Sequence, residues 1–164
     1  SAEAIRDQAL LASGLLVERL GGPSVKPWQP DGVWSESGAS GGEYKPDTGE
    51  GRYRRSLYTY RKRTAPPPGL LTLDAGSREI CQPRRLATNT PLQPLLFLND
   101  QGFFECAKSL AKRVIKEQAS GPDPQIQHAF LWLTSRQPAT EEMTILRDLY
   151  AQQLAHFTAE MAAA

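Results

Sequence analysis

The strongest constraint on the fold is a helical periodicity of apolar residues through most of residues 88–160. Steps of three and four residues place these side chains along one face of a helix. Breaks in the pattern carry residue types that begin or end helices, at Thr90-Pro91, Asn99-Asp100, Gly121-Pro122 and Pro138-Ala139-Thr140. We therefore predict a helical C-terminal half over 88–160, with a short helix after Thr90 and longer ones at about 101–118, 124–134 and 141–160.

The first twenty residues show the same periodicity, and we predict a helix over residues 2–20. Its expected stop is Gly21-Gly22-Pro23, because glycine adopts the left-handed conformation and proline cannot continue a helix. The apolar faces of both helical regions supply the predicted core, which includes Leu15 and Phe104. Two such regions around one core indicate a mainly α protein.

A long irregular loop is predicted for residues 23–52, which contain four prolines and a glycine- and serine-rich stretch at 37–42. We expect residues 36–50 to be the most mobile part, because a loop of this length is unusual in a compact domain. The loop also holds Trp28 and Trp34. Since two exposed indoles would leave much apolar surface in water, at least one is expected to pack on the body.

Residues 52–63 are the segment richest in side chains that could bind a ligand, with six basic residues and three tyrosines. The alternation from Leu57 to Lys62 is compatible with a short strand, and residues 70–73 with a second one. We therefore predict a two-stranded element around residues 55–73, interrupted by the three prolines at 66–68.

Two interpretations of this basic segment stay open. Arginine and tyrosine side chains together can hold an anionic polymer, or stack on sugar rings or bases. The candidate ligand-binding residues are Arg54, Arg55, Tyr58, Tyr60, Arg84 and Arg85. Alternatively, the aromatic rings pack inward and the arginines pair with acidic groups elsewhere, because long basic side chains often cover apolar surface.

The charge distribution is uneven. Residues 52–86 carry nine basic and two acidic groups, a net of +7, although the whole chain is at +1. Salt bridges to the mildly acidic flanks explain this pattern, and so does a surface for an anionic partner. A nucleic-acid partner is not expected at so small an overall charge. No membrane span is expected, because no apolar run approaches about 20 residues.

Catalytic and metal-binding patterns are weak, and we assign no catalytic residue and no metal site. Asp74 and Glu79 are two carboxylates near the basic zone, and paired carboxylates can cleave glycosides. Cys81 lies near Arg84-Arg85, which would favour a reactive thiolate, but a buried structural cysteine is the more common case. The sequence does not decide whether Cys81 and Cys106 form a disulfide. No C-x-x-C-H motif is present, so no haem c attaches to this chain.

Four strings stand in order along the chain: LVERLGGPSVKPWQP at 16–30, RRSLYTY at 54–60, KRTAPPP at 62–68 and TNTPLQ at 88–93. Together they resemble the C-terminal domain of unknown function of large planctomycete proteins that carry a cytochrome c-type segment. Arg61 stands where that family commonly has Trp, and Pro94 where it has Ala. The resemblance implies an exported, extracytoplasmic protein whose haem-bearing segment lies upstream. It assigns no catalytic residue.

We accordingly predict a single domain over residues 1–164, cut from a larger protein and built as a small helical bundle with a long irregular loop. The first functional hypothesis is an accessory module that contacts upstream domains of the same polypeptide or an anionic or glycan ligand. An alternative is part of an extracytoplasmic enzyme that acts on glycans, with the basic segment lining its cleft. Nucleic-acid binding is the weakest alternative, and whether the chain is an enzyme stays open.

Overall fold

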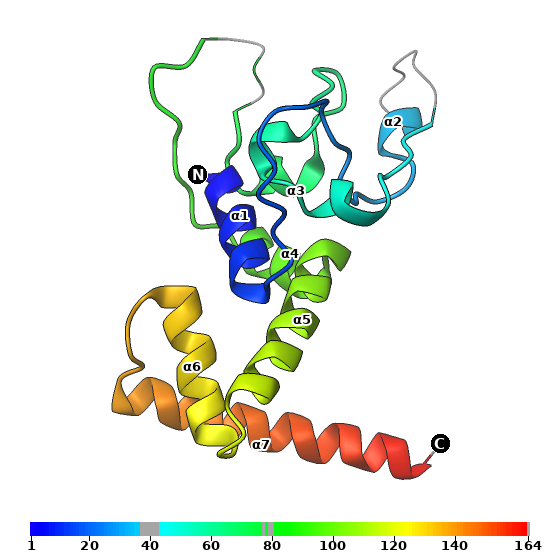
Figure 1. Ribbon diagram of the computed structural model, residues 1–164. Coiled ribbons are helices and arrows are strands. Elements are labelled where there is room, and N and C mark those ends of the chain that lie inside the picture. Colours follow the sequence, from blue (N-terminus) through cyan, green and yellow to red (C-terminus); the bar gives the residue numbers. More distant parts are fainter. Residues whose placement is uncertain (37–42, 77, 79–80, 164) are drawn as a thin grey trace. The chain divides into compact units, whose positions relative to one another are not determined.

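The computed structural model describes residues 1–36, 43–76, 78 and 81–163. Within these ranges the fold is mainly helical, as predicted. The chain forms two compact units, Ser1–Ser109 and Leu110–Ala164, and the boundary falls inside helix α5. Figure 1 labels the helices α1 (Ala2–Ser13), α2 (Val33–Glu36), α3 (Pro68–Thr72), α4 (Leu92–Asn99), α5 (Gln101–Glu117), α6 (Pro122–Thr134) and α7 (Thr140–Ala163), and two 3-10 turns accompany them, η1 (Gly49–Tyr53) and η2 (Ser56–Tyr58).

Helix α1 is shorter than the predicted helix over 2–20, because it ends at Gly14. Gly14 has φ 74°, in the left-handed region that glycine adopts without a steric penalty. The next two N–H groups, of Leu15 and Leu16, both bond back to the carbonyl of Leu10 at 3.0 and 3.1 Å. The apolar spacing continues past this point, but the chain after Gly14 is extended and irregular, so the prediction was wrong there.

The predicted two-stranded element around 55–73 was also wrong, since no strand forms among the described residues. Residues 70–73 lie in and just after α3, where Leu70 and Leu73 are both buried and Leu71 between them is 40% exposed. Two inward residues three positions apart fit one face of a helix, whereas a strand would put them on opposite faces. Pro68 begins α3, where its fixed φ suits the first turn.

The core of the first unit lies where α1 meets α3. A buried cluster of Ala2, Leu70, Leu73 and Ala75 packs against Leu96 and Phe103. The Phe103 ring also meets Phe97 edge to face, with 4.8 Å between ring centroids. Phe104, predicted to be in the core, is 63% exposed. The apolar periodicity of α5 is compatible with either phenylalanine in the core. In the structure it is Phe103 that packs against the buried cluster.

The described residues of the predicted loop, 23–36 and 43–52, are irregular apart from α2 and the start of η1. Trp34 is buried against the rings of Tyr44 and Tyr60, so the expectation that one indole packs inward is confirmed. Its ring also lies under the ammonium of Lys62, 4.3 Å from the ring centroid. Residues 37–42 of the expected mobile stretch lie outside the described residues.

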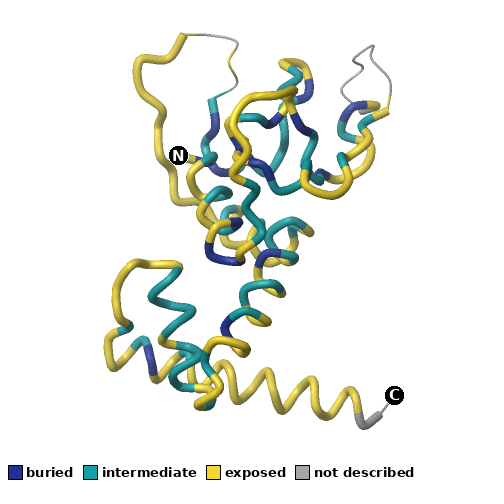
Figure 2. The backbone as a smooth tube through the Cα atoms, viewed as in Figure 1, coloured by how far each residue is buried: buried dark blue, intermediate teal, exposed yellow. Residues whose placement is uncertain are grey.

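In the second unit, α6 and α7 pack against each other, and Figure 1 shows α7 lying across α6 at a steep angle. Arg147 of α7 holds Asp123 of α6 through two hydrogen bonds of 2.9 and 2.7 Å. The bounds of α5, α6 and α7 lie within a few residues of the predicted ones, which confirms the helical C-terminal half. Figure 2 shows α7 exposed along its C-terminal half. In the described part of the chain, no helix is long and apolar enough to cross a membrane.

The stability of the first turns of α7 is expected to depend on pH. Arg136 binds Glu142 through bonds of 2.7 and 2.6 Å, and the Ala139 N–H donates to the same carboxylate at 2.8 Å. The Arg136 hydrogen bonds are the main reason that the pKa of Glu142 is lowered from 4.5 to about 2. A carboxyl with a depressed pKa stabilises the fold above its ordinary pKa and loses this effect as pH falls through about 2.

We therefore expect Glu142→Gln to be less stable than wild type at pH 6, with the gap closing as pH falls from about 4.5 towards 2. Amide hydrogen exchange in the first turns of α7 measures this local stability. Glu141→Gln is the matched control, because the Glu141 side chain is exposed at the neighbouring position. An equal gap for Glu142→Gln at every pH would contradict the role given to the ionised carboxylate.

Candidate functional site

The basic segment is fixed to helix α1 by Arg6. The guanidinium of Arg6 donates to the carbonyls of Arg52 at 2.7 Å and Arg54 at 2.9 Å, and to the Ser56 hydroxyl at 3.1 Å. On the next residue of α1, Asp7 accepts the Ser56 N–H at 2.7 Å. Backbone groups of residues 52–56 thus find partners on a helix far away in sequence, which is why this irregular segment has a defined path.

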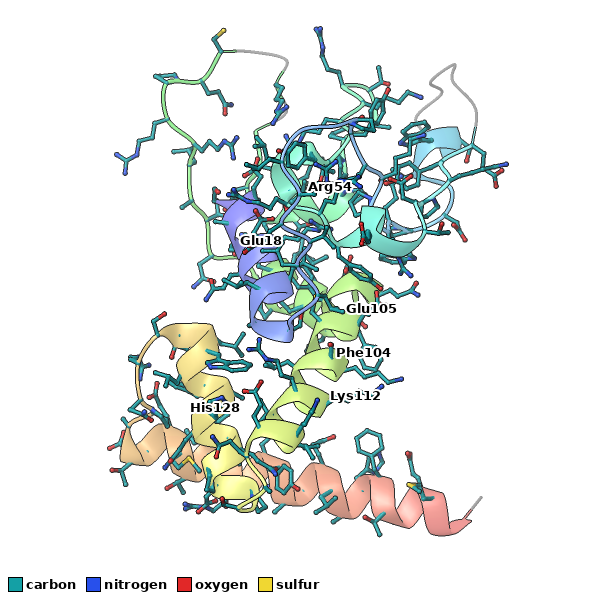
Figure 3. The ribbon with its side chains drawn as sticks, viewed as in Figure 1. Glu18, Arg54, Phe104, Glu105, Lys112 and His128 are labelled. Atoms are coloured by element: carbon teal, nitrogen blue, oxygen red, sulfur yellow. The ribbon has the colours of Figure 1, made fainter. Side chains whose placement is uncertain are left out.

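Arg54, one of the predicted ligand residues, is completely buried at 0% exposure. Its guanidinium donates to three backbone carbonyls, at 2.9 Å to Arg19, at 3.0 Å to Pro23, and to Gly21. The Cζ atom of the guanidinium lies 3.9 Å from the Tyr58 ring centroid, and the Tyr58 hydroxyl accepts the Gly21 N–H. Arg54 and Tyr58 therefore hold the turn that follows α1. Figure 3 labels Arg54 within this part of the first unit.

The other predicted ligand residues lie apart from this pair. Arg55 is exposed and meets Asp7 at 3.4 Å. Tyr60 lies 5.9 Å from Trp34, ring centroid to ring centroid. Arg85 pairs with Glu3 of α1 at 2.7 Å, and Arg84 is exposed. The structure thus brings Arg54 and Tyr58 together but does not gather the six residues into one site.

The carboxylates and cysteines noted in the sequence do not form a catalytic group among the described residues. Asp74 accepts the Thr88 N–H at 2.7 Å and its hydroxyl at 2.8 Å, and these bonds lower the pKa of Asp74. Glu79 lies outside the described residues. Cys81 is exposed, Cys106 is buried, and both are free thiols. Within the described ranges, no group of three or more His, Cys, Asp or Glu side chains could hold a metal ion.

The first unit contains a cavity of about 80 Å³, which is room for roughly three water molecules at about 30 Å³ each. It is formed by segments far apart in sequence: helix α1, the loop at 27–30, the segment that carries Arg52, Tyr53 and Thr59, helix α3, and Asp100 with the first turns of α5. Apolar surface comes from Trp28, Phe103 and several prolines. Of the basic segment, Arg52, Tyr53 and Thr59 line this space, while the six predicted ligand residues do not.

Two of the residues that line this cavity each carry a buried polar atom that has no hydrogen-bond partner among the described residues and less than 1 Å² of accessible surface. These atoms are the amide nitrogen Nε2 of Gln29 and the hydroxyl oxygen of Thr59. Gln29 is 4% exposed and Thr59 is 7% exposed. A buried polar group without a partner costs about 1–3 kcal/mol. Because neither atom is accessible to a water-sized probe, neither faces the space of the cavity.

The charged groups of the cavity already have hydrogen-bond partners within the protein. Glu105 accepts the Tyr53 hydroxyl at 2.7 Å and faces the Arg52 guanidinium at 3.3 Å. Hydrogen bonding to Glu105 raises the pKa of Tyr53. Asp100 accepts the Phe103 N–H at 3.0 Å, and burial raises the pKa of the Asp100 carboxyl. Figure 3 shows Glu105 projecting from α5.

Sequence reasoning missed most of this site. Asp100 was interpreted as a helix cap, and its bond to the Phe103 N–H confirms that role. Gln29 and Thr59 carry no local signal, because a glutamine between prolines and a threonine between tyrosines have no motif meaning by themselves. Two features noted in the sequence lie in this region: Trp28, an indole in a polar loop, and the start of the basic segment with Arg52 and Tyr53.

Comparison with known proteins gives one family and no closer relative. The family model of PSD1, a protein of unknown function (DUF1553), matches residues 1–150. No curated protein matches the chain, and no solved structure does. The matched stretch includes the whole first unit with its cavity and extends to the middle of α7. Because the match covers more than nine-tenths of the 164 residues, the chain belongs to the PSD1 family of unknown function.

Proposed function

We propose that this chain is a ligand-contact module of a larger protein, and that the cavity of its first unit is the contact site. The observation that carries the proposal is the cavity itself, in which the apolar side chains of Trp28 and Phe103 lie beside the polar groups of Arg52 and Glu105. Their positions are held by a scaffold in which the basic segment is bound to α1. An accessory role agrees with this arrangement, because Arg6 and Arg54 donate to backbone carbonyls of the same unit and so stabilise its fold.

The setting we propose is an exported, extracytoplasmic protein of planctomycete type that carries a cytochrome c segment upstream. Support comes from the four strings at 16–30, 54–60, 62–68 and 88–93. The haem would be bound by that upstream segment, and the upstream domains are the proposed protein partners. Exposed apolar residues at steps of four, three and four along α7 offer a surface for such a contact; they are Tyr150, Leu154, Phe157 and Met161.

A second candidate is an enzyme that acts on glycans. It draws on one observation, that the carboxyls of Asp100 and Glu105 both line the cavity and that burial raises the pKa of Asp100. A raised pKa is what a general acid needs at neutral pH. The ligand-contact role is preferred because Glu105 is engaged by Arg52 and Tyr53. Nucleic-acid binding has less support, since Arg54 is buried and Arg85 pairs with Glu3.

The proposal is tested by a ligand screen on the wild-type chain and on Trp28→Leu, which removes the indole from the cavity wall. Small organic acids, amines, neutral sugars and amino acids are added at millimolar concentration, and the thermal midpoint is recorded. We expect at least one compound to stabilise wild type and not Trp28→Leu, because a ligand that binds only the folded state raises its stability. Gln127→Met, at an exposed position of α6, is the control. If nothing in any class distinguishes the two proteins, the ligand-contact role fails.

A further inference from the structure

We infer that the C-terminal half of α7 binds the same half of a second copy of this chain, with the two helices running in opposite directions. The inference does not depend on the ligand-contact role of the cavity, and it narrows the partner of this surface from the upstream domains to a second copy. Its basis is an exposed apolar stripe whose spacing is the same when read from either end. This α7 stripe consists of Tyr150, Leu154, Phe157 and Met161, which are between 40% and 82% exposed.

The α7 stripe continues a face that is buried at the start of the helix. Met143 lies seven residues before Tyr150, hence on the same side of the helix, and is buried. Arg147 is still held by Asp123 of α6, but residues 147–161 are all exposed, as Figure 2 shows for this part of α7. Because helices in proteins owe most of their stability to the packing of an apolar face, about four exposed turns gain much from a partner helix.

The spacing of the stripe is that of a coiled-coil seam. Its steps of four, three and four residues keep the apolar side chains on one face, where they can interlock with those of a second helix. An antiparallel copy places Tyr150 opposite Met161 and Leu154 opposite Phe157, and the methionine sulfur suits an aromatic neighbour. Each copy then presents the same surface that it binds, as a two-fold symmetric dimer requires.

The residues beside the stripe also fit a second copy. Residues 148–161 contain no lysine or arginine, and the acidic group beside the stripe is Glu160. In the antiparallel pair, Glu160 of one copy lies near Gln153 of the other, whose amide can donate to the carboxylate. The opposite flank carries Ala151 and Thr158, which are small and uncharged. No like charges therefore meet across the pair, whereas a helix with strongly charged flanks would find few opposite charges here.

The size of the stripe predicts a weak dimer. At roughly 100 Å² for each half-exposed apolar side chain, the four residues of both copies would bury about 800 Å² in total, less than the roughly 1,200–2,000 Å² of a standard interface. We therefore expect a dissociation constant of about 10–100 µM, so that the dimer forms only in concentrated solution.

The test is sedimentation equilibrium of the whole chain from about 5 µM to about 1 mM, a range that brackets this affinity. A reducing agent is included, because Cys81 is an exposed free thiol. We expect Leu154→Glu to weaken the dimer about tenfold or more, since it would bury a carboxylate in the seam of each copy. Gln152→Glu is the matched control, because it adds the same charge on the opposite side of the helix and should change nothing.

Gln153→Lys tests the direction of the pairing. In the antiparallel dimer a lysine at this position would face Glu160 of the other copy, so the dimer should tighten about threefold at low ionic strength and lose this gain in high salt. Without that gain, the antiparallel arrangement is wrong.

Two other results would overturn the inference. A chain that stays monomeric at about 1 mM would leave the stripe to the upstream domains or to the first unit. A dimer that Leu154→Glu does not weaken would have its interface elsewhere. Both results leave the ligand-contact function standing, since the ligand screen tests it separately.

Discussion

Replacing Arg54 with methionine should destabilise the first unit by about 2–4 kcal/mol, because the buried guanidinium donates to three backbone carbonyls that would lose a charged donor. Methionine keeps much of the side-chain length and removes the planar fork. The turn at residues 19–23 would then lose its anchor, and with it the Tyr58 contact to Gly21. Urea unfolding combined with amide exchange at Val25 and Tyr60, whose N–H groups are hydrogen-bonded, measures the effect within this unit.

Arg55→Met is the matched control for this prediction. Arg55 is the next residue in the chain, its side chain is about half exposed, and its contact with Asp7 is long at 3.4 Å. An exposed ion pair of this kind contributes between 0 and about 1 kcal/mol. Equal losses for the two variants would show that charge in this segment matters and that the buried fork of Arg54 does not. Arg54→Lys separates the two further, since lysine keeps the charge but cannot present the same array of donors.

The second large effect is expected for Leu70→Ala, which should cost about 2–5 kcal/mol by leaving a cavity in the core. Leu70 is 5% exposed and belongs to the cluster with Ala2, Leu73 and Ala75. It also lines the proposed ligand cavity, so the variant would open that space as well as weaken the core. The measurement is the free energy of unfolding from urea titration.

Leu71→Ala provides the comparison, because its side chain is 40% exposed on the opposite side of the same short helix. We expect a cost below about 1 kcal/mol for this change, as for other partly exposed positions. A larger loss for Leu71→Ala than for Leu70→Ala would mean that this segment does not turn as α3 does. The pair thus tests the element for which the strand prediction failed.

The elements that could be predicted are those whose signal is local. The helices after residue 100 follow from apolar spacing and from breaks such as Gly121-Pro122, and their observed bounds differ from the expected ones by only a few residues. Where two local signals competed, the prediction failed. Gly14 ends α1 although apolar residues continue at helical spacing, and residues 70–73 form a helical turn although their composition suits a strand.

The candidate site could not be predicted in the same way. Arg54 and Arg55 are identical neighbours in the sequence, yet one is buried under three carbonyl contacts and the other is exposed. Nothing within a few residues distinguishes them, because the carbonyls that bind Arg54 belong to residues 19–23. Gln29 and Thr59 become notable only when the fold buries them without partners.

By itself the sequence determined the helical half and the family of this chain, because helix periodicity and sequence strings are properties of neighbouring residues. Only the tertiary structure shows that the basic segment is hydrogen-bonded to α1. It also shows the cavity beside this segment and the two unpartnered polar atoms of Gln29 and Thr59. The physical reason is that the burial and hydrogen bonding of a side chain depend on partners brought from distant parts of the chain.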